Sequence, residues 1–143
     1  MRQHVTKPGA GRNYDWSNDH IFIKTAADLT GGQVTFVEDR LKSRFHLARH
    51  YHKKITEIFY ILEGAVRFVF DGEVVMATRG TTVSIPHGVH HEVDCEAGGR
   101  LLSIFCPGGF DRYLEEIASL SEKQLANGGF MTELAEKYDT WAT

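Results

Sequence analysis

Histidines are the residues of this chain best suited to chemistry, with eight of them against two cysteines. His50 and His52 lie two positions apart, so on a β-strand their imidazoles point to one face, close enough to bind one metal ion. Lys53 and Lys54 fit a short turn that returns the chain antiparallel, which lets Glu57 face both imidazoles from the next strand. This segment predicts two imidazoles and one carboxylate around a metal.

A third imidazole comes from His91, which follows a glycine- and proline-containing segment at residues 80–90. If His91 also points inward, the site consists of three imidazoles and one carboxylate. Such a set leaves positions open on an octahedral ion, which suits Fe(II), Mn(II), Ni(II) or Co(II) and tolerates Zn(II). The expected cofactor is therefore one divalent transition metal, acting as a Lewis acid and template for a small molecule.

The elements that must position these residues are predicted to be β-strands from about His20 to Phe105. Short runs rich in Ile, Val, Phe and Thr are separated by Gly, Asp and Asn, a pattern typical of a sandwich or barrel. The run from Arg44 to His52 alternates with a period of two, which puts His46 on the face of His50. His46 is therefore a candidate catalytic acid or base, and the alternative is a core histidine with a satisfied hydrogen bond.

Other segments flank this β-rich region. Residues 1–19 are polar and are expected to form a loosely tied arm, with the barrel at residues 20–106. Residues 107–143 show helical periodicity and are expected to form a helical extension that packs outside the barrel or over its mouth. Within it, Ser121 and Gln124 fit a capping box, and the run from Asn127 to Gly129 fits a helix stop.

The spacing of the ligand candidates resembles the two motifs of the cupin superfamily. The first motif is present as His50, His52, Glu57 and Gly64. The second motif is present as Gly80, Pro86, Gly88 and His91. The chain departs from the family at Arg44, where a glycine is usual, and at Cys95, where an asparagine is frequent. Neither position is a metal ligand, so the metal prediction is unaffected.

Thr30-Gly31-Gly32 precedes the strand with the first ligands, and Pro107-Gly108-Gly109-Phe110 opens an acidic amphipathic helix. With these segments the chain, from about Thr25 to Leu120, also resembles the single-domain quercetinase-like cupins, which are similar to quercetin dioxygenases. This resemblance implies an all-β fold, the cupin double-stranded β-helix or jelly-roll barrel, with short C-terminal α-helices and frequent homodimers. It further implies a metal held by His50, His52, Glu57 and His91, and a dioxygenase acting on a small cyclic or aromatic enol-like substrate. Glu57 would take the substrate proton, as its counterpart does in those enzymes.

Two other functions are compatible with the same residues. Cupins also act as isomerases, lyases or polyketide cyclases, in which the metal polarises a carbonyl and no oxygen is consumed. A third possibility is a non-catalytic cupin that binds a small molecule, because a fold hosts many functions.

Composition and charge exclude some classes of binding partner. The net charge is -3 with the two signs interspersed, which argues against nucleic-acid binding. No apolar run approaches the ~20 residues that span a bilayer, and the segment from Met1 to Thr6 lacks the apolar centre of a signal peptide. Cys95 and Cys106 are expected to be reduced thiols in a cytoplasmic protein. The expected partners are a small-molecule substrate and a second copy of the chain, since exposed strand edges favour pairing.

Overall fold

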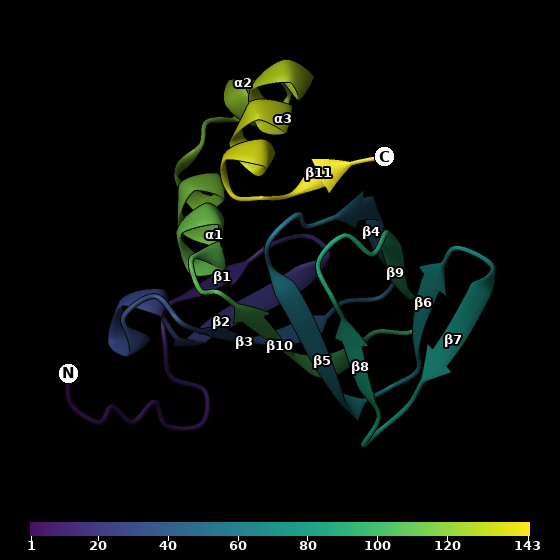
Figure 1. Cartoon of the computed structure of the whole chain (residues 1–143), viewed down its shortest axis with the longest axis horizontal. Coiled ribbons are helices and arrows are strands. Elements are labelled where there is room, and N and C mark those ends of the chain that lie inside the picture. Colours follow the sequence, from purple (N-terminus) through teal and green to yellow (C-terminus); the bar gives the residue numbers. More distant parts are fainter.

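The computed structural model describes residues 1–143 as two antiparallel sheets with a helical segment at one end (Figure 1). The first sheet has the strand order β1-β2-β3-β10-β5-β8. Its strands are β1 (Asn13–Asp15), β2 (Asp19–Thr25), β3 (Thr35–Leu41), β10 (Gly99–Cys106), β5 (Thr56–Glu63) and β8 (Thr82–Ile85). A short 3-10 helix, η1 (Ala27–Thr30), lies between β2 and β3.

The second sheet has the order β11-β4-β9-β6-β7. Its strands are β11 (Trp141–Ala142), β4 (Phe45–Tyr51), β9 (His91–Cys95), β6 (Val66–Phe70) and β7 (Glu73–Ala77). Strands β6 and β7 are joined by a two-residue turn in which Gly72 has a φ of 74°, the left-handed conformation that glycine adopts without strain. The two strands therefore form a tight β-hairpin.

The hydrophobic core lies between the inner faces of the two sheets. Strand β5 shows the period of two that a half-buried strand requires, because Glu57, Phe59 and Ile61 are buried in alternation. Phe59 packs against Phe68 of β6 with ring centroids 5.1 Å apart. Val93 of β9 belongs to the same buried cluster. The structure thus confirms the predicted all-β barrel.

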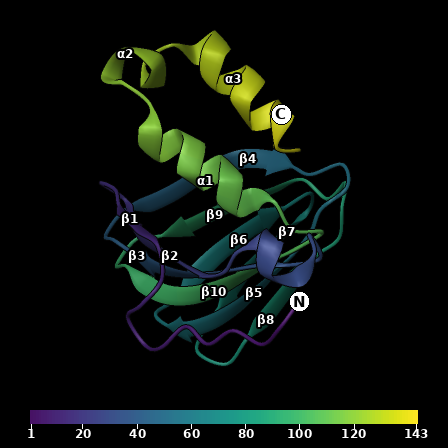
Figure 2. The ribbon, with the colours of Figure 1, turned by 90° about the vertical axis from the view of Figure 1, so that its left-hand side faces the viewer.

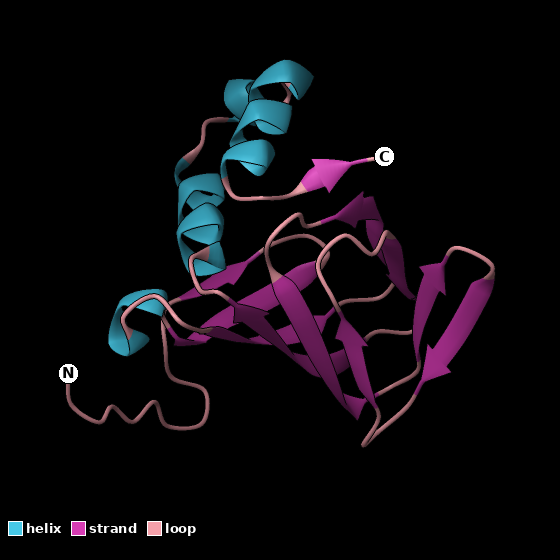
Figure 3. Cartoon of the chain, in the orientation of Figure 1, coloured by secondary structure: helices cyan, strands magenta, loops and turns pink.

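Three short helices follow the barrel, as the sequence predicted (Figure 3). They are α1 (Phe110–Ser119), α2 (Glu122–Leu125) and α3 (Gly128–Lys137). Figure 2 shows α1 crossing one end of the barrel, with α3 beyond it. The capping box predicted for Ser121 and Gln124 opens α2. No helix of the chain combines the length and apolar character needed to cross a lipid bilayer.

Three local features differ from the sequence prediction. Strand β1 lies within the stretch predicted as a loosely tied arm, because its residues pair with β2. Strand β11 ends the predicted helical extension by pairing with β4. The segment predicted as a helix stop does follow the end of α2, but it also begins α3, since the Asn127 side chain accepts a hydrogen bond from the Phe130 N–H and so caps that helix.

Candidate metal centre

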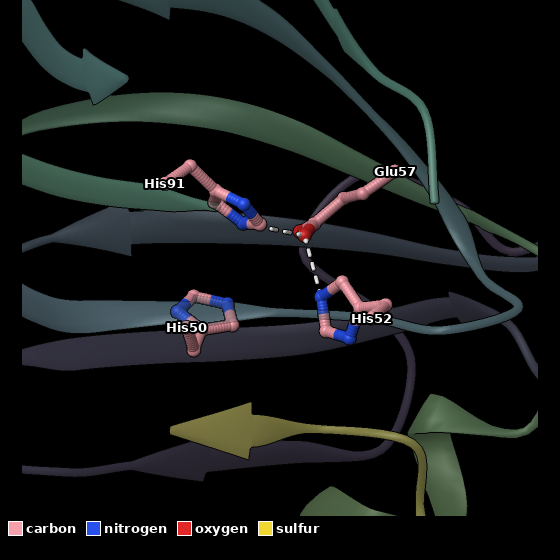
Figure 4. Close-up of side chains that lie close together, drawn as sticks. All are labelled: His50, His52, Glu57 and His91. Atoms are coloured by element: carbon pink, nitrogen blue, oxygen red, sulfur yellow. Dashed lines mark hydrogen bonds and ion pairs between the residues drawn. The ribbon is translucent and has the colours of Figure 1, made fainter. Parts of the chain in front are cut away.

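Four side chains converge inside the barrel (Figure 4): His50, His52, Glu57 and His91. His50 belongs to β4 and His52 follows that strand, whereas Glu57 comes from β5 and His91 from β9. One ligand atom from each lies within 4.8 Å of all the others. The Glu57 Oε1 atom is 3.3 Å from His52 Nε2 and 3.7 Å from His91 Nε2. All four residues are buried, so the structure brings together the complete predicted ligand set.

Backbone carbonyls orient all three imidazole rings. His50 Nδ1 donates to the carbonyl of Ala48 at 2.8 Å, and His91 Nδ1 donates to that of Val89 at 2.9 Å. His52 Nδ1 donates to the carbonyl of Asp139 at 2.8 Å. Because a carbonyl only accepts, each Nδ1 carries the proton when the ring is neutral, and each Nε2 keeps a free lone pair. This is the outer-shell arrangement that metal-binding histidines require.

One of the Nε2 atoms has no hydrogen-bond partner within the protein. His91 is fully buried, and its Nε2 neither donates nor accepts a hydrogen bond. A buried polar atom left unsatisfied costs about 1–3 kcal/mol, and a metal ion would satisfy it. Three neutral imidazoles and one carboxylate are a suitable donor set for a divalent transition metal. The four residues therefore fit such an ion.

The electrostatics of the site keep two of its ligands in the form that binds a metal. Burial lowers the pKa of His50 to about 4, and the neighbouring His91 acts in the same direction. Burial on its own would raise the pKa of Glu57, but the neighbouring His52 and His91 rings outweigh it and lower that pKa to about 2. At neutral pH, His50 is therefore a neutral imidazole and Glu57 a carboxylate.

The structure corrects the placement of His46. Strand β4 pairs with β9 as Leu47 opposite Val93 and then as His50 opposite His91, which is a one-residue β-bulge. A bulge reverses which residues face inward, so His50 points into the barrel whereas His46 points out. The His46 side chain is 56% exposed and forms an ion pair with Asp94. The expectation that His46 lines the pocket with the ligands is therefore wrong.

A residue that the sequence did not indicate, Asp139, holds the turn between the first two ligands and Glu57. Its carboxylate accepts hydrogen bonds from the backbone N–H groups of Lys53 (2.8 Å), Lys54 (2.8 Å) and Ile55 (3.0 Å). It also accepts one from the indole Nε1–H of Trp141 at 3.1 Å. Since its carbonyl orients His52 as well, Asp139 is a positioning residue for the candidate metal centre. No sequence pattern links it to residues 84 to 87 positions earlier.

Two positions at which the cupin motifs usually have glycine lie next to strands around the site. Arg44, where the family usually has glycine, adopts a φ of 64°, so the left-handed conformation is kept although the glycine is not. Gly64 has a φ of 88°, and a Cβ atom there would lie 2.8 Å from the carbonyl oxygen of Gly98. Glycine is therefore required at position 64 by both conformation and space.

A cavity of about 440 Å³ leads to the ligands. His50, His52 and Glu57 line it, and most of its remaining wall is hydrophobic. Phe105 of β10 and Phe110 of α1 stack in this wall with centroids 4.2 Å apart. Residues of α1, α3 and β11 complete the lining. The C-terminal segment therefore covers the mouth of the barrel, which is one of the two placements that the sequence left open. Such a shape suits a small, largely apolar molecule with few polar groups.

Comparison with known proteins identifies relatives of this fold. The family described as Cupin domain matches residues 40–105, which include all four ligand candidates. Quercetin 2,3-dioxygenase of Bacillus subtilis (strain 168) is 25% identical over 96 residues, covering 66% of this chain. The match spans only 28% of the length of that dioxygenase.

Two solved structures illustrate the range of proteins with this fold. An RmlC-like cupin from Shewanella frigidimarina has a TM-score of 0.68 at 20% identity, covering 78% of this chain and 96% of that chain. The polyketide cyclase RemF from Streptomyces resistomycificus has a TM-score of 0.63 at 16% identity, covering 74% of this chain and 80% of that one. At identities this low, the similarity shows that the chain has the same fold, but it does not show that the chain catalyses the same reaction.

Proposed function

We propose that the chain is a cupin superfamily protein and a metal-dependent oxygenase acting on a small cyclic or aromatic enol-like substrate. The observation that carries the proposal is the convergence of three oriented imidazoles and one carboxylate at the end of a largely hydrophobic cavity. Four protein ligands leave positions open on an octahedral ion, where substrate oxygens and a second small molecule can bind.

The residues of the chain have separate roles in this proposal. His50, His52, Glu57 and His91 hold the metal, which when bound supplies Lewis-acid activation of the substrate's oxygen atoms. Glu57 is the catalytic base, because it is ionised at neutral pH and lies among the metal ligands, where it can accept the proton of an enol hydroxyl. Phe105 and Phe110 provide an apolar wall that contacts the ring and excludes water.

The oxygenase reaction is supported by the 25% identity to a quercetin dioxygenase over 96 residues. Since this match covers less than a third of that protein, its substrate is not transferred. The fold similarity to a polyketide cyclase supports a second candidate, a metal-dependent cyclase, isomerase or lyase that consumes no oxygen. The two candidates share the metal site and differ only in whether oxygen is a reactant.

Elemental analysis combined with oxygen uptake tests the proposal. We expect protein purified without added metal to contain one transition metal per chain, and we expect His50→Ala and His91→Ala to lose both the metal and turnover. His87→Ala is the matched control, because His87 is exposed and outside the ligand set. Retention of metal in both ligand variants would refute the site.

The substrate screen uses flavonols and cyclic enols with an oxygen electrode and product analysis. Oxygen consumption that depends on the metal supports the oxygenase. Metal-dependent conversion without oxygen consumption supports the cyclase, isomerase or lyase instead. A ligand that binds the metal-loaded protein and is never converted identifies a binding protein and contradicts both enzyme proposals.

A further inference from the structure

Two buried carboxyl groups lie in the same cavity, apart from the metal ligands. Asp19 of β2 and Asp39 of β3 are only 5% and 8% exposed. Asp19 pairs with Leu41 and Asp39 with Ile21 across the two strands, which puts both carboxyl groups on the inner face of the first sheet as diagonal neighbours. Both residues line the cavity together with His50. The largely hydrophobic wall thus contains a second cluster of polar residues in addition to the metal ligands.

The two carboxyl groups are hydrogen-bonded to each other, and the pair has few further partners within the protein. Asp39 accepts a hydrogen bond from the Ser103 hydroxyl at 2.9 Å, and Ser103 also lines the cavity. The Oδ1 atom of Asp19 is buried and has no hydrogen-bond partner. Lys42, a nearby cation, forms its ion pair with Asp15 instead. Because an unsatisfied buried polar atom costs about 1–3 kcal/mol, this oxygen is suited to accept a group from a bound molecule.

The charge state of the pair determines what it can bind. Burial, followed by the neighbouring charge of Asp39, raises the pKa of Asp19 to about 10. Burial likewise raises the pKa of Asp39. The pair therefore keeps a proton at neutral pH and offers both a hydrogen-bond donor and acceptors. A hydroxyl group, which donates and accepts, complements it better than a cation, which needs two carboxylates in charged form.

The pair is also well separated from the ligand set. Strand β10 lies between β3, which carries Asp39, and β5, which carries Glu57. Neighbouring strands are about 4.8 Å apart, so β3 and β5 are about 10 Å apart across the sheet. Asp39 lies level with Ile61, four residues along β5 from Glu57, which adds about 13 Å along the strands. A molecule of at least two-ring size is therefore needed to contact both places.

We propose that Asp19, Asp39 and Ser103 form a second polar subsite of the cavity, which binds a hydroxyl group of the ligand away from its metal-bound end. The proposal rests on the proposed function for the identity of that metal-bound end. It narrows the substrate class to molecules with an enol or hydroxyketone at one end, a hydroxyl group at the other and an apolar ring system between them.

Phenol and toluene are the probes that test this subsite, because they differ only in a hydroxyl and a methyl group. Binding to the full-length protein is measured by calorimetry and by NMR shifts of the β2 and β3 amides. In Asp19→Leu and Asp39→Leu we expect phenol affinity to fall about 10-fold, as loss of one hydrogen bond predicts. Toluene affinity should stay the same or rise. Asp28→Leu is the matched control, since Asp28 is exposed and outside the cavity.

Several results would overturn the subsite. They are an equal loss of phenol and toluene affinity, the absence of phenol binding or of amide shifts in β2 and β3, and tighter binding of benzylamine than of phenol. Should a leucine variant fail to fold, Asp19→Ala removes the carboxyl group without adding a bulky apolar side chain and must still weaken phenol binding relative to toluene. Phenol binding is also measured in His50→Ala, where it should persist, so failure of the metal site and failure of this subsite are separate results.

Discussion

Replacement of Asp139 by asparagine tests how the C-terminal segment supports the candidate metal centre. Asparagine has the same shape as aspartate and tolerates the φ of 58° found at this position. The backbone and its carbonyl bond to His52 can therefore remain, while one carboxylate oxygen becomes an NH₂ group. The substitution changes the hydrogen bonds to the turn at residues 53–55 and to the Trp141 indole, and little else.

The size of the effect follows from the donors around Asp139. One carboxylate oxygen accepts from the N–H groups of Lys53 and Trp141, and the other accepts from those of Lys54 and Ile55. Whichever way the new amide is oriented, two N–H donors face its NH₂ group and lose their acceptor. At about 1–1.5 kcal/mol for each lost bond, the free energy of unfolding should fall by about 2–3 kcal/mol.

The turn connects His52 to the strand that carries Glu57, so the same change should loosen two ligands. Loss of outer-shell support of this kind typically reduces metal affinity by 10–100-fold. Urea denaturation and a metal titration against a competing chelator measure the two effects, with Asp28→Asn as the exposed control. A metal affinity within twofold of the wild type, at any loss of stability, would refute the positioning role of Asp139.

Three other perturbations have expected outcomes. Chelation of the metal should lower the melting temperature of the wild type, since free metal at 100 times its Kd adds about 2.7 kcal/mol to the free energy of unfolding. The melting temperature of His91→Ala should not change on chelation. Calorimetry measures both. Asp19→Asn should become more stable relative to the wild type as pH rises from 5 to 8. The pKa of Asp19 is higher in the folded than in the unfolded protein, so the wild type loses stability between these two pKa values, whereas asparagine does not ionise. Urea denaturation at each pH gives the difference, and stability curves that stay parallel would contradict the prediction. Gly72→Ala should lower the free energy of unfolding only by the ~1–2 kcal/mol of left-handed backbone strain, because a Cβ atom there meets no other atom. Gly64→Ala should lower it by more, because a Cβ atom there also collides with the Gly98 carbonyl. Denaturation of the two variants compares the losses.

The residues that bind the metal could be identified from the sequence because their relation is local or is carried by a spaced motif. His50 and His52 share a strand end, Glu57 follows after one turn, and the motif around His91 has a fixed spacing. Strand alternation and turn residues likewise predicted the barrel, because both signals depend on neighbours within a few residues.

Tertiary structure alone decided the remaining features of the site. The bulge in β4 depends on its pairing with β9, so simple alternation placed His46 on the wrong face. Asp139 reaches the turn at residues 53–55 only because β11 pairs with β4 and brings the chain end back. Asp19 and Asp39 become a buried pair only where two strands and the cavity meet. In each case the deciding contact joins segments that folding brings together, and no local pattern records it.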